Sequence, residues 1–168
     1  MSRFIPSFLA GLFTAIVIAA AAPIGSASAA DVEKRGDAFV IYLPGNLEFF
    51  EVFNRLQSEI LAANWQITNV QDIDVGMTQY GLTIKNKVIS ACKSQLLAKA
   101  IQEDPFISLA VPCRFTVFSD ASSGKIVVGF HDPAAEAKAL GIKNYAAAGQ
   151  ATEELKAVLK TMADFYAQ

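Results

Sequence analysis

The stretch that decides the fold opens with Lys87-Val88-Ile89-Ser90-Ala91-Cys92 and occupies residues 87–132. Its first six residues alternate in the manner of a β-strand, and a helical pattern over 94–102 follows at once. Further along, Pro112-Cys113-Arg114-Phe115-Thr116-Val117-Phe118 and residues 125–131 predict two strands joined by a turn-rich segment. These two strands form the clearest hairpin in the chain. The central stretch also contains both cysteines and the only histidine of the protein.

Strand and helix signals alternate on both sides of this stretch. Asn46 is the expected cap of the first helix, and Asn64 is suited to the left-handed conformation that ends it. Residues 106–111 are apolar and fit neither pattern clearly. The expected elements outside the central stretch are a strand at 38–43, a helix at 47–63, a strand at 65–70, a weak helix at 75–80, a short helix at 133–140 and a long helix at 145–166.

Three of the predicted helices are amphipathic, and each has an apolar stripe that needs a partner surface. The stripes comprise Phe49, Phe53, Leu56 and Ile60 in the first helix, Leu96, Leu97 and Ile101 in the helix after Cys92, and Ala151, Leu155, Val158, Leu159, Met162 and Phe165 in the last. Together with the hairpin, they predict an α+β fold: a two-layer domain with a mixed or largely antiparallel sheet, helices packed on one face, and a long C-terminal helix.

Residues 1–29 have the features of a signal peptide. Arg3 gives a positive start, residues 8–22 are apolar or small, and Ala27-Ser28-Ala29 is an A-x-A cleavage sequence. The apolar run is shorter than the roughly 20 residues that span a membrane, so we expect cleavage near Ala29 and no stable membrane anchor afterwards. The prediction is an exported bacterial protein, periplasmic or secreted, whose residues 30–168 form a single α+β domain.

The charge of the chain is nearly balanced, with a formal net charge of −2 and a pI near 5.4. No block of basic residues is present that would attract a phosphate backbone. We therefore expect no nucleic acid partner.

The central stretch resembles the bacterial domain-of-unknown-function 302 family. The residues that carry the resemblance are Ile89-Ser90-Ala91-Cys92, the helical Leu96-Leu97-Ala98-Lys99-Ala100, and the Pro112-Cys113-Arg114 that begins the next strand. It extends from about Asp37 to His131, and the chain departs from it in Cys92-Lys93-Ser94, where many members have a proline. The resemblance implies a small two-layer domain with a largely antiparallel sheet, and it implies no established activity.

The two cysteines, Cys92 and Cys113, allow three interpretations: a disulfide, two buried thiols, or a functional thiol or ligand site. Export favours a disulfide. If the two strands that carry them were parallel neighbours joined by a crossover, however, the cysteines would lie about a strand length apart, beyond the roughly 4.4–6.8 Å that a disulfide allows between Cα atoms. The sequence leaves all three open.

His131 has two interpretations as well. It could join Cys92 or Cys113 as a metal ligand, since imidazole and thiolate together suit zinc or copper. Its position at the end of a strand, directly before the helix cap Asp132, favours a partly exposed strand-end residue instead.

No catalytic motif is present: the serines lack a G-x-S-x-G context, and there is no C-x-x-C pair. We predict no catalytic residue, no cofactor and no metal site. The favoured hypothesis is a non-enzymatic module that binds a small ligand or a protein partner, with Cys92, Cys113, Arg114 and His131 as candidate binding residues. The alternative is a thiol-based redox or metal-binding protein that uses Cys92 and Cys113.

Overall fold

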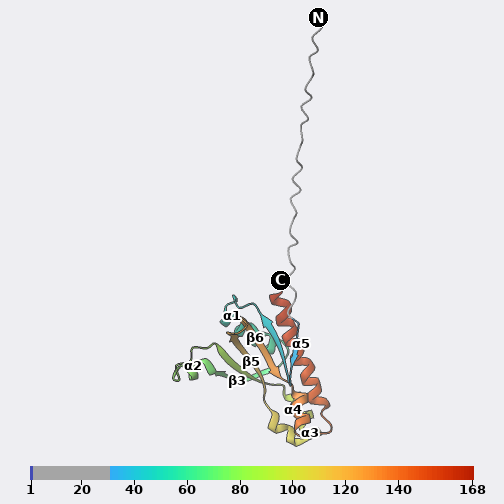
Figure 1. Ribbon diagram of the computed structural model, residues 1–168. Coiled ribbons are helices and arrows are strands. Elements are labelled where there is room, and N and C mark those ends of the chain that lie inside the picture. Colours follow the sequence, from blue (N-terminus) through green and yellow to red (C-terminus); the bar gives the residue numbers. More distant parts are fainter. Residues whose placement is uncertain (2–30) are drawn as a thin grey trace.

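The computed structural model describes Met1 and residues 31–168, so the predicted signal peptide lies, apart from Met1, outside the described residues. Strands and helices alternate along the chain, and the longest helix comes last (Figure 1). The elements are β1 (Glu33–Arg35), β2 (Ala38–Leu43), α1 (Phe49–Ala62), β3 (Gln66–Asp72), α2 (Ile73–Thr78), β4 (Asn86–Cys92), α3 (Ser94–Glu103), the 3-10 helix η1 (Pro105–Ala110), β5 (Cys113–Asp120), β6 (Lys125–His131), α4 (Pro133–Ala139) and α5 (Ala146–Tyr166).

The strands form one six-stranded sheet in the order β1-β2-β6-β5-β4-β3, and every neighbouring pair is antiparallel. The predicted hairpin is β5 and β6, in which Phe115 lies opposite Phe130 and Asp120 opposite Lys125. The prediction of an α+β domain with a largely antiparallel sheet and a long C-terminal helix is confirmed.

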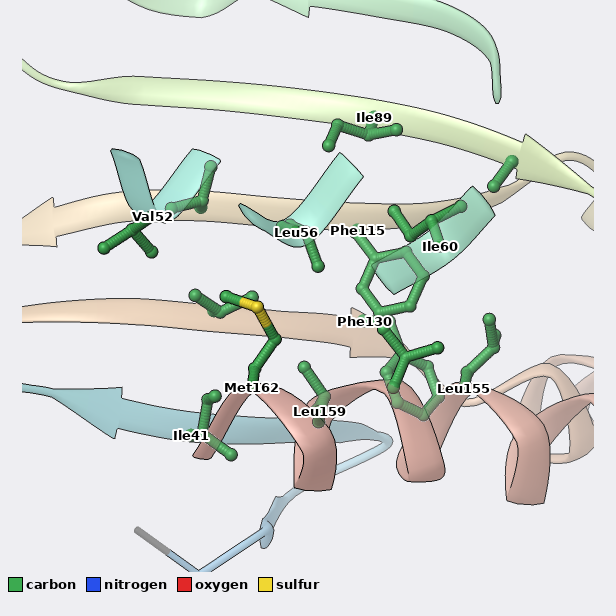
Figure 2. Close-up of a cluster of buried hydrophobic side chains, with 14 of the residues drawn as sticks. Ile41, Val52, Leu56, Ile60, Ile89, Phe115, Phe130, Leu155, Leu159 and Met162 are labelled. Carbon is green, nitrogen blue, oxygen red and sulfur yellow. The ribbon is translucent and has the colours of Figure 1, made fainter. Parts of the chain in front are cut away.

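Helices α1 and α5 cover one face of the sheet and supply most of the core. Their buried side chains point toward the strands from two directions and meet around Phe115 and Phe130, whose ring centroids are 5.5 Å apart (Figure 2). Because side chains alternate across a strand, the residues at every second position of β4, β5 and β6 enter this layer. The fully buried members include Ile41, Leu56, Ile60, Ile89, Phe115, Leu155, Leu159 and Met162.

A smaller apolar cluster lies at the end of the sheet where α3, η1, α4 and α5 come together (Figure 1). The segment 106–111, which had no clear sequence signature, belongs here as η1. Its Ile107 is buried against Ala137 of α4 and Ala148 of α5. The small side chains of this cluster allow the four helices to approach closely.

Several local expectations were wrong. Asn46 does not cap α1, whose N-cap is Glu48. Ile101 and Phe165 are exposed, at 41% and 44%, because their helices turn Leu96 and Met162 into the core instead. The aromatic ring of Phe165 is covered in part by the guanidinium of Arg55, 3.9 Å from its centroid. The left-handed Asn64, with a φ of 59°, ends α1 as predicted.

Candidate functional site

An apolar cavity lies at the second cluster, where the ends of β4 and β5 meet the helices. Its volume is ≈ 40 Å³, it is partly open to solvent, and its wall is almost entirely apolar. Residues of seven elements or their flanking positions line it: Trp65, Ala91, Cys92, Lys93, Leu96, Leu97, Ala100, Ile107, Ala110, Val111, Cys113, Pro133, Ala147, Ala148 and Ala151.

The cavity exists because small residues face it. Helix α5 contributes Ala147, Ala148 and Ala151 along one side, and a methyl group at each position leaves space that a leucine would fill. Pro133 begins α4 on the rim, where the carboxylate of Asp132 accepts a hydrogen bond from the Ala134 amide, 3.0 Å away. The cavity therefore results from the small side chains of α5 and from the position at which α4 begins.

Both predicted cysteines line this cavity, at the ends of two antiparallel neighbours. Cys113 begins β5 directly opposite Ala91 of β4, and Cys92 is the next residue of β4. The strands are thus antiparallel, and the parallel arrangement that would have separated the two residues by a strand length is wrong. The cysteines lie at the same end of the sheet, and both are free thiols.

The thiol of Cys113 is held protonated. Burial raises its pKa to about 12, and the negative charges of Glu136 and of an ionised Cys92 act in the same direction. Burial also raises the pKa of Cys92, although a backbone hydrogen bond from Lys93 opposes the shift. Since the thiolate is the reactive form, these surroundings suit an apolar lining and disfavour nucleophilic chemistry.

Arg114 and His131 do not line the cavity, but Glu136 brings them together. Their positions in β5 and β6 alternate with the buried Phe115 and Phe130, so both side chains point to the other face of the sheet. Glu136 Oε1 is 3.0 Å from Nδ1 of His131 and 3.7 Å from Nη2 of Arg114. His131 is half exposed at the end of β6, as the strand-end interpretation expected.

Glu136 therefore relates three of the four predicted residues to one another, because its charge acts on Cys113 while its oxygen contacts the two basic side chains. It was not singled out from the sequence. It sits one turn into a short alanine-rich helix, and nothing in the local pattern signals that this helix folds back against β5 and β6.

A second polar group supports the opposite wall. Trp65 Nε1 donates a hydrogen bond of 3.1 Å to Glu154 Oε2, and Lys93 Nζ lies 2.7 Å from the same oxygen. Partial burial raises the pKa of Glu154, but hydrogen bonds from Lys93, Gln150 and Trp65 outweigh it, and the pKa ends below its ordinary value. Glu154 thus fixes two lining residues, and the sequence offered no sign of this role either.

Other hollows on the described residues are larger but less suited to a specific ligand. One of ≈ 430 Å³ is open and lies between the segment Thr83–Lys85 and the β5–β6 turn. It contains none of the four predicted residues. The apolar cavity remains the candidate site because predicted residues and a continuous apolar wall coincide there.

Within residues 31–168, no group of three histidine, cysteine or acidic side chains is placed to hold a metal ion. None of the helices described there has both the length and the apolar character needed to cross a bilayer.

Comparison with known proteins gives a family. The sequence profile of the family described as "Domain of unknown function DUF302" matches residues 42–162, which reaches from β2 almost to the end of α5. A crystal structure of an uncharacterized conserved DUF302 protein from Bacillus stearothermophilus has the same fold, with a TM-score of 0.64 and 13% sequence identity over 79% of this chain and 99% of that one. No curated protein matches the sequence. Since the profile covers most of the chain, this protein belongs to the DUF302 family.

Proposed function

We propose that this protein is an exported, non-enzymatic binding module whose cavity receives a small apolar group. The group is either a small molecule or an apolar side chain of a protein partner. The observation that carries the proposal is the apolar wall of the cavity, which is partly open and includes Cys92 and Cys113. An open apolar cavity binds apolar groups because their surface leaves water on binding, and no hydrogen bond of the cavity wall is lost.

The size of the cavity limits what it can accept. Ligand pockets for drug-sized molecules have volumes of roughly 300–1,000 Å³, whereas this one has ≈ 40 Å³. A group the size of an aliphatic side chain is compatible with that space, particularly at the open mouth. Larger ligands would need α3 or η1 to move outward.

The outer surface of η1 favours the partner version. Ile107 faces the cavity, while Phe106 and Leu109 on the same short helix are 65% and 72% exposed. Exposed apolar side chains that gather beside an apolar cavity are typical of an interaction surface. A partner segment could cover Phe106 and Leu109 while inserting one side chain, and Arg114 and His131 would offer polar contacts nearby.

No observation favours the thiol-based redox alternative. A pKa of about 12 leaves Cys113 a thiol at neutral pH, and nucleophilic cysteines require the opposite shift. Both sulfurs instead fit the role of apolar lining groups.

Xenon binding tests the cavity directly, because xenon enters dry apolar cavities. Trp65 is the only tryptophan and lines the cavity, so its fluorescence reports on occupancy. We expect saturable quenching by xenon in the wild-type domain. Ala148→Leu fills the cavity and should abolish the saturable component.

Ala157→Leu is the matched control, since Ala157 lies on the exposed side of the same helix. It should leave xenon quenching unchanged. Equal quenching of the wild type and Ala148→Leu would show that no group enters the cavity, and the proposal would fall.

Export is tested separately on the full chain. We expect the protein to be recovered outside the cytoplasm with residues 1–29 removed, as measured by cell fractionation and intact mass. Recovery from the cytoplasm with Met1 still present would contradict export and leave the binding proposal to be judged by the xenon result.

A further inference from the structure

We propose that the β3 edge of the sheet and the adjoining flank of α1 form a dimer interface that binds a second copy of this chain. Two copies related by a two-fold axis would join their sheets through antiparallel β3 strands and pack their α1 helices side by side. This inference does not depend on the cavity or on its ligand.

The two edges of the sheet differ in how they are protected. Strand β1 is three residues long and consists of Glu33, Lys34 and Arg35, all exposed. Short, charged edge strands of this kind resist pairing with another chain. Strand β3 at the other edge has seven residues, and its only charge is Asp72 at the very end. It has no lysine and no proline, and its one bulge, at Thr68, lies near its start. The outer backbone groups of its regular part, Asn69 to Asp72, are therefore a template for a further strand.

The flank of α1 above this edge is uncharged. Phe50, Asn54, Gln57 and Leu61 are spaced four, three and four residues apart and so share one stripe of the helix. Arg55 and Glu59 lie on the opposite flank, where Arg55 stacks on Phe165 of α5. The Lys87 ammonium, which also pairs with Asp72 at the end of β3, lies 5.3 Å from the ring centroid of Phe50, so the stripe is on the β3 side of the helix.

This stripe is complementary to itself. When two copies of α1 pack antiparallel about an axis between positions 55 and 56, Phe50 faces Leu61 of the second copy and Asn54 faces Gln57 of the second copy. Both apolar residues are exposed in the single chain, at 60% and 56%. Apolar groups then meet apolar groups, and amides meet amides, which is what an isologous interface requires.

The same axis fits the strand. From its midpoint to its end α1 runs about 10 Å, at about 1.5 Å per residue. From its start to its midpoint β3 runs at most about 10 Å, at about 3.3 Å per residue, and the bulge at Thr68 shortens this half of the strand. Only residues 63–65 connect α1 to β3, so the midpoint of the helix lies above the midpoint of the strand. One axis can therefore centre both the strand pair and the helix pair. In an antiparallel pair about Asn69, Asp72 would lie near the start of β3 of the second copy and away from the second Asp72, so like charges do not meet.

Sedimentation velocity on the domain of residues 30–168 tests this interface with a charge swap. Phe50→Glu and Leu61→Lys each place a charge against an apolar residue of the second copy, and each should raise the dimer Kd about tenfold or more. The double variant F50E/L61K places opposite charges at both contacts and should recover most of the lost affinity. Circular dichroism confirms folding, which exposed positions should tolerate.

Leu140→Glu is the control, because it removes an exposed apolar residue at the end of α4, away from this edge. It should leave the dimer unchanged. A wild-type chain that stays monomeric at high micromolar concentration overturns the proposal, and so does a dimer that both single substitutions leave intact. A double variant no tighter than the single variants overturns the antiparallel register.

Discussion

Trp65 donates its indole hydrogen to Glu154 over 3.1 Å, which joins the start of β3 to the middle of α5 across 89 positions of sequence. The same carboxylate forms a salt bridge with Lys93, whose Nζ lies 2.7 Å from Oε2. This one acidic side chain thus connects the end of α1, through Trp65, with α5, to which Glu154 belongs. Its two partners, Trp65 and Lys93, line the candidate cavity.

Replacing Glu154 should lower stability. Glu154→Gln removes the charge that Lys93 and the indole face, and we expect the free energy of unfolding to fall by about 1–2 kcal/mol, because charge-assisted hydrogen bonds at a partly buried site are worth about that much. Urea unfolding followed by circular dichroism measures the change. Glu153→Gln, next along the helix and largely exposed, is the control and should cost less than about 0.5 kcal/mol. Equal losses in the two variants would mean that the Trp65 and Lys93 contacts add no stability.

The same group predicts a pH dependence. The pKa of Glu154 lies below its ordinary value of 4.5 in the folded protein, so the unfolded chain takes up its proton first as the pH falls. The stabilisation from this carboxylate is therefore complete above about pH 5 and declines below pH 4.5. The difference in unfolding free energy between wild type and Glu154→Gln should be constant from pH 5 to 7 and shrink toward pH 3. A difference that stays constant down to pH 3 would contradict the lowered pKa.

The cysteines should react slowly and unequally in the native protein. With a pKa of about 12, Cys113 is ionised in only about one molecule in ten thousand at pH 8. Cys92 is less buried than Cys113, and burial raises its pKa as well. Alkylation with iodoacetamide, followed by peptide mass spectrometry, should label Cys92 first and both residues rapidly in denaturant.

Glu136→Gln should accelerate the labelling of Cys113, because it removes a negative charge that opposes the thiolate. Glu153→Gln, far from the sulfur on the surface of α5, should have no effect. Rapid native labelling of Cys113 in the wild type would reopen the redox interpretation that its surroundings now disfavour.

The elements that sequence predicts well are those whose signals are local. The β5–β6 hairpin follows from alternation and a turn-rich segment, and α5 follows from a long apolar stripe of which Leu155, Leu159 and Met162 are fully buried. Strand β1 was not predicted, since a strand of three charged residues carries no alternation. Helical spacing also does not show where the apolar stripe of α5 stops being buried, so it did not predict that Phe165 is exposed.

The candidate site was only partly predictable, for a different reason. Cysteine and histidine attract notice by their chemistry, but their relative positions depend on strand order, and β4 and β5 proved to be antiparallel neighbours. Glu136 and Glu154 gain their roles from contacts with residues far away in sequence. Helical spacing does not distinguish them from solvent-exposed acids such as Glu153.

Two glycines provide a matched test of the packing between β2 and β6. A Cβ added at Gly129 would lie 2.7 Å from the Phe39 carbonyl oxygen and 2.7 Å from Cγ1 of Val40, both on the neighbouring strand. Because one of these two atoms belongs to the backbone, relief requires the strands to move apart, and Gly129→Ala should destabilise the domain by about 1–3 kcal/mol. Gly149 lies within α5 with nothing within 4 Å of such a Cβ. Gly149→Ala should therefore stabilise the domain by about 0.5–1 kcal/mol through helix propensity. Thermal and urea unfolding of both variants measures the two effects, and a neutral Gly129→Ala would show that β2 and β6 approach less closely than the structure has them.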